Sequence, residues 1–105
     1  MICRLWRGWT TRENADDYER IVRDEVIPGI EARNIPGFRH IDLMRRDLVD
    51  EVEFQTFMWF DSVDSIKAFM GEDYSISHVP DAARAVLKRF DSHAAHYEVI
   101  DRREQ

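Results

Sequence analysis

The sequence contains little of several residue types, and each shortage excludes a class of protein. Cys3 is the only cysteine in 105 residues, which excludes an intramolecular disulfide and a thiolate metal cluster within one chain. This fits the reducing cytoplasm, where we expect the protein to reside. The N-terminal segment Met1–Arg7 carries charges where a signal peptide needs an apolar run, and no stretch approaches the length of a membrane span. We therefore expect no membrane partner.

Basic residues are also outnumbered, with 15 Lys and Arg against 21 Asp and Glu. The formal net charge is -6, and no basic run or arginine-rich stripe stands out. Because an acidic protein repels phosphate backbones, we expect no nucleic-acid partner. The contents of 44% hydrophobic and 34% charged residues are ordinary for a globular protein, and 105 residues are the size of one domain. We therefore predict a single domain that spans residues 1–105.

Hydrophobic alternation predicts the strands. The strand patterns cover residues 2–10, 38–46, 51–60 and 94–101. The short polar segment Asp47–Asp50 separates the second pattern from the third, which indicates a hairpin.

Three- and four-residue spacing predicts the helices. A first helix follows the capping-box spacing of Thr10–Glu13, and Pro28-Gly29 should kink or end it. A second helix begins after Asp61-Ser62 and stops at Gly71, and Asp81 is placed to cap a short third helix. The resulting order, β-α-β-β-α-(α)-β, predicts a ferredoxin-like α+β fold with a four-stranded antiparallel sheet.

Large side chains occupy both faces of the predicted strands. In the first strand Arg4 and Trp6 point one way, whereas Leu5 and Trp9 point the other. The helices of a ferredoxin-like unit cover only one face of its sheet. We therefore predict that a second copy of the chain covers the other face in a homodimer.

Three segments, taken with the element order, carry a family resemblance. They are the opening Met1–Gly8, the segment Phe57–Phe69, in which a strand ending in tryptophan enters a capped helix, and the closing His96–Val99. With these segments the chain resembles the antibiotic biosynthesis monooxygenase-like domains of the dimeric α+β-barrel superfamily. The resemblance implies a homodimer whose two sheets pack face to face into a barrel, and a pocket between sheet and helices in each subunit.

His78 and Tyr74 lie in the irregular segment after the second predicted helix, where loops of this fold close over the pocket. A histidine there can serve as a general base or as a ligand to haem iron, and we assign His78 as the candidate catalytic residue. The alternative is a surface or half-buried histidine that caps the third helix. The Tyr74 phenol can bind a substrate oxygen, or its ring can simply pack on Phe69.

Arg4 and Trp6 share one face of the first strand. If this face looks toward the helices, they place a cation beside an aromatic plate, which suits a planar anionic or phenolic ligand. The alternative is an arginine paired with acidic helix residues such as Asp16 or Glu19, because a buried unpaired guanidinium is costly.

Trp59 ends the third strand. The resemblance implies a substrate-holding tryptophan in the oxygenases, so Trp59 is a candidate binding residue, although its place at the strand–helix junction also suits a core role. The asparagine that the resemblance would require for haem degradation, or for oxygenase chemistry, is missing from the first strand. Asn14 and Asn34 flank the first helix instead, so haem degradation is the less favoured activity.

Two histidine–carboxylate pairs have the spacing of possible metal ligands: His40 with Asp42, and His96 with Glu98. We interpret both as polar residues of the sheet rim or dimer interface, and we expect no metal and no cofactor. The function predicted from the sequence is a cofactor-independent monooxygenase, or a related small enzyme, acting on a planar phenolic or aromatic molecule. The alternatives are a ligand-binding protein without turnover and a structural homodimer.

Overall fold

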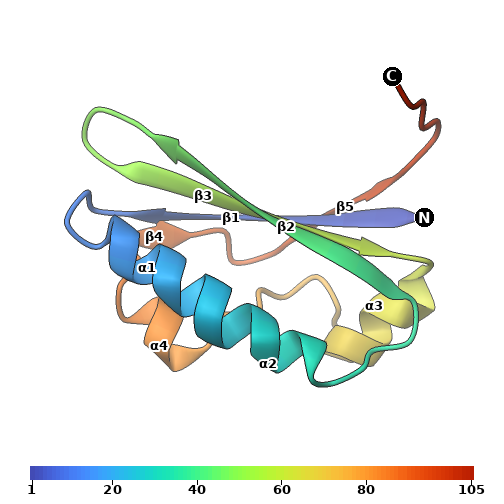
Figure 1. Ribbon diagram of the computed structural model, residues 1–105. Coiled ribbons are helices and arrows are strands. Elements are labelled where there is room, and N and C mark those ends of the chain that lie inside the picture. Colours follow the sequence, from blue (N-terminus) through green and yellow to red (C-terminus); the bar gives the residue numbers. More distant parts are fainter.

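The computed structural model describes residues 1–105 as two layers (Figure 1). An antiparallel sheet forms one layer, and all the helices lie on one of its faces. The strands are β1 (Ile2–Thr10), β2 (Phe38–Asp47), β3 (Val52–Phe60), β4 (Arg89–Phe90) and β5 (Ala95–Glu98). The helical segments are α1 (Ala15–Ile21), η1 (Val22–Val26), α2 (Ile27–Glu31), α3 (Val63–Met70) and α4 (Asp81–Arg84). None of these helices is both long and apolar enough to cross a membrane.

The strand order β2-β3-β1-β4, with β5 also paired to β1, confirms the ferredoxin-like arrangement. The sheet has five strands where the sequence predicts four: β5 lies within the last predicted strand, residues 94–101, whereas β4 precedes that strand and was not predicted. Between β4 and β5, the chain separates from β1 and forms hydrogen bonds with the segment that follows α3. The Ala94 amide donates to the Ser75 carbonyl over 2.7 Å, and Ile76 forms a β-bridge with His93. This detour ties residues 75–77 to the edge of the sheet.

The first helix is continuous from α1 through η1 to α2, and so Pro28 does not end it. Pro28 lies at the start of α2, directly after η1 and inside the continuous helix. The preceding η1 is a π-helical segment, and a π-helix winds more widely than an α-helix. The carbonyls before Pro28 therefore do not have the α-helical positions in which they clash with a proline ring. The N-terminus also differs from the expectation: Asn14 is the N-cap residue, and Thr10 remains in β1.

The predicted limits of α3 are confirmed. The Ser62 hydroxyl accepts a hydrogen bond from the Ser65 amide over 3.3 Å, and Gly71 ends the helix with a φ of 89°. Gly37, which precedes β2, is also required: its φ is 80°, and a Cβ there would lie 2.0 Å from the Ser65 hydroxyl oxygen. These contacts set the position of α3 against the sheet.

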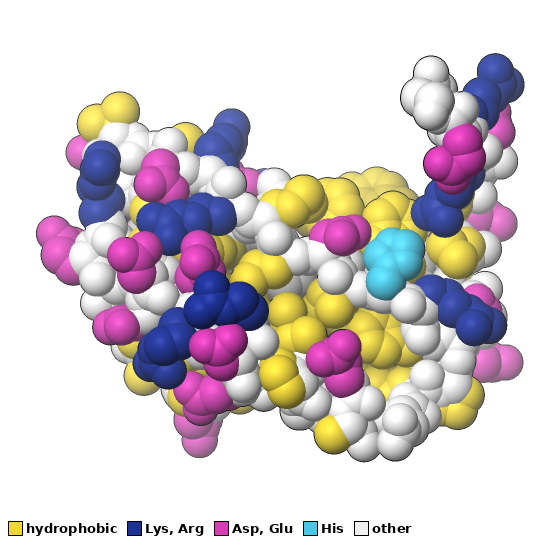
Figure 2. All heavy atoms as spheres, viewed as in Figure 1, with side chains coloured by type: hydrophobic (Ala, Val, Ile, Leu, Met, Phe, Trp, Pro, Cys, Tyr) yellow, Lys and Arg dark blue, Asp and Glu magenta, His cyan; other side chains and the backbone are white.

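Two buried clusters fill the space between the layers. One includes Trp6, Tyr18 and Phe54, and the other includes Phe60 and Phe69. Figure 2 shows apolar side chains gathered in the middle of the visible face, while charged side chains of both signs crowd its left side, over the α1 end. The candidate site lies where the two clusters meet.

The face of the sheet opposite the helices has no covering layer (Figure 1). Along β1 and β3 it presents Leu5, Phe57 and Trp59, all of which are partly buried, and on β5 it presents Tyr97, which is 59% exposed. This uncovered surface is the one that the predicted homodimer would bury, and the dimer itself stays a prediction.

Candidate functional site

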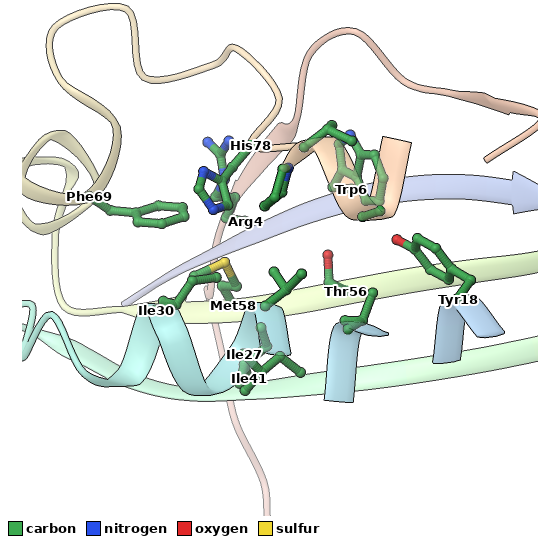
Figure 3. A pocket seen from close by; sticks show the side chains of 15 residues that line it. Arg4, Trp6, Tyr18, Ile27, Ile30, Ile41, Thr56, Met58, Phe69 and His78 are labelled. Carbon is green, nitrogen blue, oxygen red and sulfur yellow. The ribbon is translucent and has the colours of Figure 1, made fainter. Parts of the chain in front are cut away.

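A cavity lies between the helix layer and the helix-facing side of the sheet (Figure 3). Eleven of its fifteen lining residues are hydrophobic, and the lining comes from β1, β2, β3, the first helix, α3, α4 and the segment before α4. The space that the centres of water-sized molecules can reach is about 50 Å³, so the cavity is narrow. Three residues that the sequence selects, Arg4, Trp6 and His78, line it together.

Arg4 is buried, with an exposed fraction of 3%, and no carboxylate pairs with it. Its Nη1 donates to the main-chain carbonyl of Tyr74 and lies 3.0 Å from His96 Nε2, and its Nη2 donates to the carbonyl of Ile76 over 2.8 Å. Burial lowers the pKa of Arg4 to about 10, so the guanidinium remains charged at neutral pH.

The alternative interpretation, in which Arg4 pairs with Asp16 or Glu19, is wrong. Arg45 of β2 occupies those carboxylates, with Nη1 at 2.8 Å from Asp16 and 3.1 Å from Glu19. Arg4 is stabilised instead by carbonyl dipoles of the segment between α3 and α4. Since a guanidinium has five N–H donors and three are engaged, it keeps two donors for a ligand.

His78 lies at the mouth of the cavity and remains exposed to solvent. Its ring meets the edge of the Phe69 ring, with centroids 5.2 Å apart. Partial burial lowers the pKa of His78 below its ordinary value, and the positive charges of Arg33 and Arg4 lower it further. The imidazole is therefore neutral at pH 7 and able to accept a proton.

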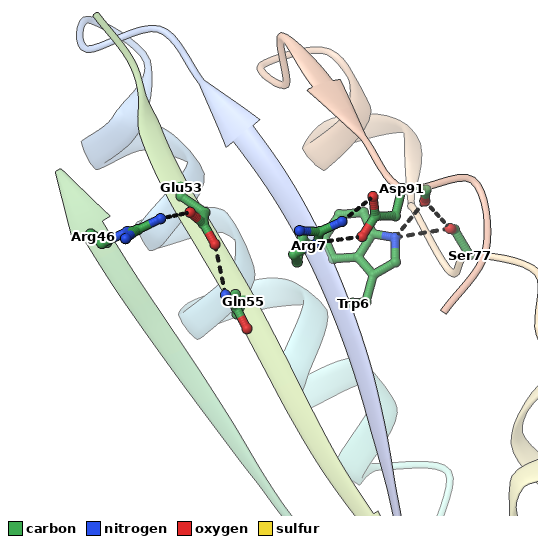
Figure 4. Close-up of polar contacts among 7 residues, drawn as sticks. All are labelled: Trp6, Arg7, Arg46, Glu53, Gln55, Ser77 and Asp91. Carbon is green, nitrogen blue, oxygen red and sulfur yellow. Dashed lines mark hydrogen bonds and ion pairs between the residues drawn. The ribbon is translucent and has the colours of Figure 1, made fainter. Parts of the chain in front are cut away.

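Trp6 presents its ring to the cavity, because its indole nitrogen is already engaged (Figure 4). Nε1 donates to the Ser77 hydroxyl and to the Asp91 carbonyl, each over 2.8 Å. Gly8 lies two residues further along the same face, and a Cβ there would lie 2.9 Å from the Trp6 ring. The absence of a side chain at Gly8 thus makes room for the indole.

Tyr74 reaches the site through its backbone alone. Its carbonyl holds Arg4, but the side chain does not line the cavity and packs edge-on against His96, with centroids 5.2 Å apart. The ring also contacts the apolar cluster that contains Phe69, as in the alternative interpretation.

The structure does not bring Trp59 to the cavity. Strand alternation directs Thr56 and Met58 of β3 toward the helices, so Trp59 points to the uncovered face. There its Nε1 donates to Asp42 over 3.0 Å, and its ring lies against His40, with centroids 5.3 Å apart.

Two polar cavity residues were missed by the sequence analysis: Tyr18 and Thr56. The three- and four-residue spacing of the first helix indicates only an apolar residue at Tyr18, although a tyrosine there brings a hydroxyl into the core. Figure 3 shows this hydroxyl pointing toward the cavity. Burial raises the pKa of Tyr18 well above its ordinary value, so it stays a neutral donor. Thr56 was recognisable as the polar member of the helix-facing side of β3.

The two predicted histidine–carboxylate pairs differ in structure. His40 Nε2 lies 3.9 Å from Asp42 on the uncovered face, whereas His96 contacts Arg4. No group of three His, Cys, Asp or Glu side chains is arranged to hold a metal ion.

Comparison with known proteins bears on the fold. No protein-family model and no curated protein matches the sequence. Among solved structures, the chain is similar to a Bacillus cereus protein provisionally described as an antibiotic biosynthesis monooxygenase, with a TM-score of 0.65 over 99% of this chain and 97% of that one. The chain has the antibiotic biosynthesis monooxygenase-like fold. At 12% identity, the similarity shows the fold alone.

Proposed function

We propose that this protein is a cofactor-independent monooxygenase that acts on a planar phenolic molecule. The observation that carries the proposal is the meeting of Arg4, Trp6 and His78 in one apolar cavity. A buried cation without a carboxylate partner favours an anionic ligand, because its attraction to a phenolate is strong where water is excluded. The monooxygenase-like fold supports the reaction class.

Each of the three side chains has a role in the proposed reaction. His78 accepts the proton of the phenolic hydroxyl, and Arg4 stabilises the resulting phenolate through its two remaining donors. Trp6 lies along the plane of the aromatic ring. The neutral Tyr18 hydroxyl and Thr56 supply further hydrogen bonds in a cavity that is otherwise apolar.

The oxidant in this proposal is dioxygen. The electron-rich phenolate reduces O₂, and a carbon–oxygen bond forms at the ring carbon para to the phenolate oxygen. One oxygen atom then remains as a new carbonyl, and the other leaves as water with the two hydrogens lost by the substrate. With 1-naphthol as the probe, the products are 1,4-naphthoquinone and water.

Turnover of 1-naphthol tests the proposal, with oxygen consumption and quinone absorbance as readouts. His78→Ala should lower turnover about 100-fold or more, the usual contribution of a positioned base, while the Kd for 1-naphthol stays nearly unchanged. His93→Ala is the matched control, because His93 is exposed and outside the cavity. Turnover that survives His78→Ala would show that His78 is not the base.

Binding without turnover is the second candidate function. It is favoured by the absence from the first strand of the asparagine that the family resemblance would require for oxygenase chemistry. Saturable binding of 1-naphthol with no oxygen consumption would identify this function.

A further inference from the structure

A surface groove continues the cavity outward. The groove and the cavity share Val26, Ile30, His78 and Pro80, so the two spaces meet along η1, α2 and the segment before α4. The space in the groove that the centres of water-sized molecules can reach is about 280 Å³, larger than that in the cavity. A ligand held by Arg4 can therefore extend past His78 into the groove.

Arg33 lines this groove and is fixed in position. Its Nη2 donates to the carbonyl of Phe69 over 2.8 Å and to that of Ala68 over 3.5 Å, at the C-terminal end of α3. Its Nε and Nη1 have no hydrogen-bond partner in the chain, and no carboxylate pairs with it. Arg33 thus keeps three N–H donors for a ligand.

Arg33 and Arg4 lie around the same aromatic ring. The Cζ atoms of Arg33 and Arg4 are 5.2 Å and 5.6 Å from the centroid of the Phe69 ring, and His78 meets this ring edge-on. Both guanidinium groups lower the pKa of His78, so the charge of each is felt at the junction of cavity and groove.

The one carboxylate of the groove is already engaged. Glu25 lies 3.3 Å from Arg20 and does not neutralise Arg33. Two cations without carboxylate partners, one inside the cavity and one in the groove, are notable in a chain whose net charge is -6. Such an arrangement attracts an anion along the path from groove to cavity.

We propose that the substrate is a hydroxylated aromatic carboxylate, whose phenolate is bound by Arg4 in the cavity while its carboxylate is bound by Arg33 in the groove. This inference rests on the proposed function and narrows its substrate class. A carboxylate and a guanidinium match in shape and charge, and the partial anchoring of Arg33 reduces the entropy lost on binding. Arg33 is then a specificity residue that takes no part in the chemical step.

Three probes of closely related shape test this inference by calorimetry. They are 1-naphthol, 5-hydroxy-2-naphthoate, and the methyl ester of the latter, which has similar size without the charge. Arg33→Gln should weaken binding of 5-hydroxy-2-naphthoate about tenfold, the value of one charge-assisted hydrogen bond at an exposed site. The affinities for 1-naphthol and the ester should change by less than about twofold, since neither presents a charge to Arg33.

Arg12→Gln is the matched control. Arg12 is also an arginine that donates to main-chain carbonyls, those of Leu48 and Val49, and it lies outside the groove. A second variant, Gly29→Leu, blocks the groove directly: Gly29 lines it, and a Cβ there meets nothing within 4 Å, so the helix can accept the side chain. Gly29→Leu should weaken 5-hydroxy-2-naphthoate and its ester while sparing 1-naphthol.

The outcomes separate this inference from the proposed function. If 1-naphthol binds but 5-hydroxy-2-naphthoate binds no better than its ester, the carboxylate site is refuted and the phenol site stands. If Arg33→Gln weakens all three probes equally, Arg33 merely supports α3, and the inference is again refuted. If the wild-type protein binds none of the probes, both proposals are overturned.

Discussion

The Nη1 atom of Arg4 lies 3.0 Å from Nε2 of His96, in a contact between a cation and an imidazole. Arginine can only donate, so Nε2 of His96 must accept, and the ring proton must be on Nδ1. This arrangement requires a neutral histidine. Partial burial lowers the pKa of His96, and the charge of Arg4 lowers it further.

This contact predicts that stability decreases in mild acid. His96 has an ordinary pKa of about 6.5 in the unfolded chain and a lower one in the folded protein, so the unfolded chain binds the proton first as the pH falls. The free energy of unfolding should therefore fall below about pH 6.5 and level off once the pH is below the native pKa. His78, whose pKa is also lowered, adds to this decrease.

Urea denaturation at a series of pH values measures the effect. His96→Gln should reduce the decrease between neutral and acidic pH, whereas His93→Gln, at an exposed position, serves as the control. An unchanged pH dependence in His96→Gln would mean that the histidine titrates normally in the folded protein.

Arg4→Met should loosen the segment between α3 and α4. The variant leaves the Tyr74 and Ile76 carbonyls without their donor. An unsatisfied acceptor costs about 1–3 kcal/mol when fully buried and less where water can reach it, as it can near the exposed Ile76. Removing a buried charge offsets part of this cost. Amide hydrogen exchange should accelerate at Ser77 and Ala94, whose N–H groups join this segment to residues 92–94 of the same chain.

The β2–β3 hairpin supplies the internal control for Arg4→Met, since its exchange should be unchanged. Equal acceleration throughout the chain would indicate global destabilisation rather than the release of one segment.

Trp6 and Trp59 should respond differently to a ligand, because they lie on opposite faces of the sheet. With Trp9→Phe and Trp59→Phe combined, Trp6 is the remaining tryptophan, and its fluorescence should be quenched when 1-naphthol binds. Trp59→Phe by itself should leave the affinity for 1-naphthol within about twofold of wild type. A larger loss would place the ligand on the uncovered face.

The uncovered face should hold two copies of the chain together. An obligate interface commonly buries about 2,000 Å² or more in total, so sedimentation should detect a dimer at micromolar concentration. Phe57→Glu puts a charge in the middle of this face and should yield monomers. Val49→Glu is the control, because Val49 is 83% exposed in the β2–β3 turn. A folded wild-type monomer would contradict the dimer.

Those features that depend on neighbouring residues were predictable from the sequence. Alternation identifies β1, β2 and β3, and the contact between Ser62 and Ser65 spans only three residues. Alternation also places Arg4 and Trp6 on one face, and it already separates Trp59 from the helix-facing residues Thr56 and Met58. The cavity side of the sheet was thus readable before the structure, even though Trp59 was assigned to binding.

Other features were settled only in the folded chain, because they depend on contacts between distant residues. The partners of Arg4 lie 70 to 92 positions away, and two of them are main-chain carbonyls, which no side-chain pattern reveals. Asp16 and Glu19, the carboxylates considered as partners of Arg4, pair instead with Arg45 of another strand. Between β4 and β5, residues 92–94 leave β1 because they bond with residues 75–77 instead. Local spacing determined the main strands and helices. Packing between distant parts of the chain determined which groups pair with each charged side chain.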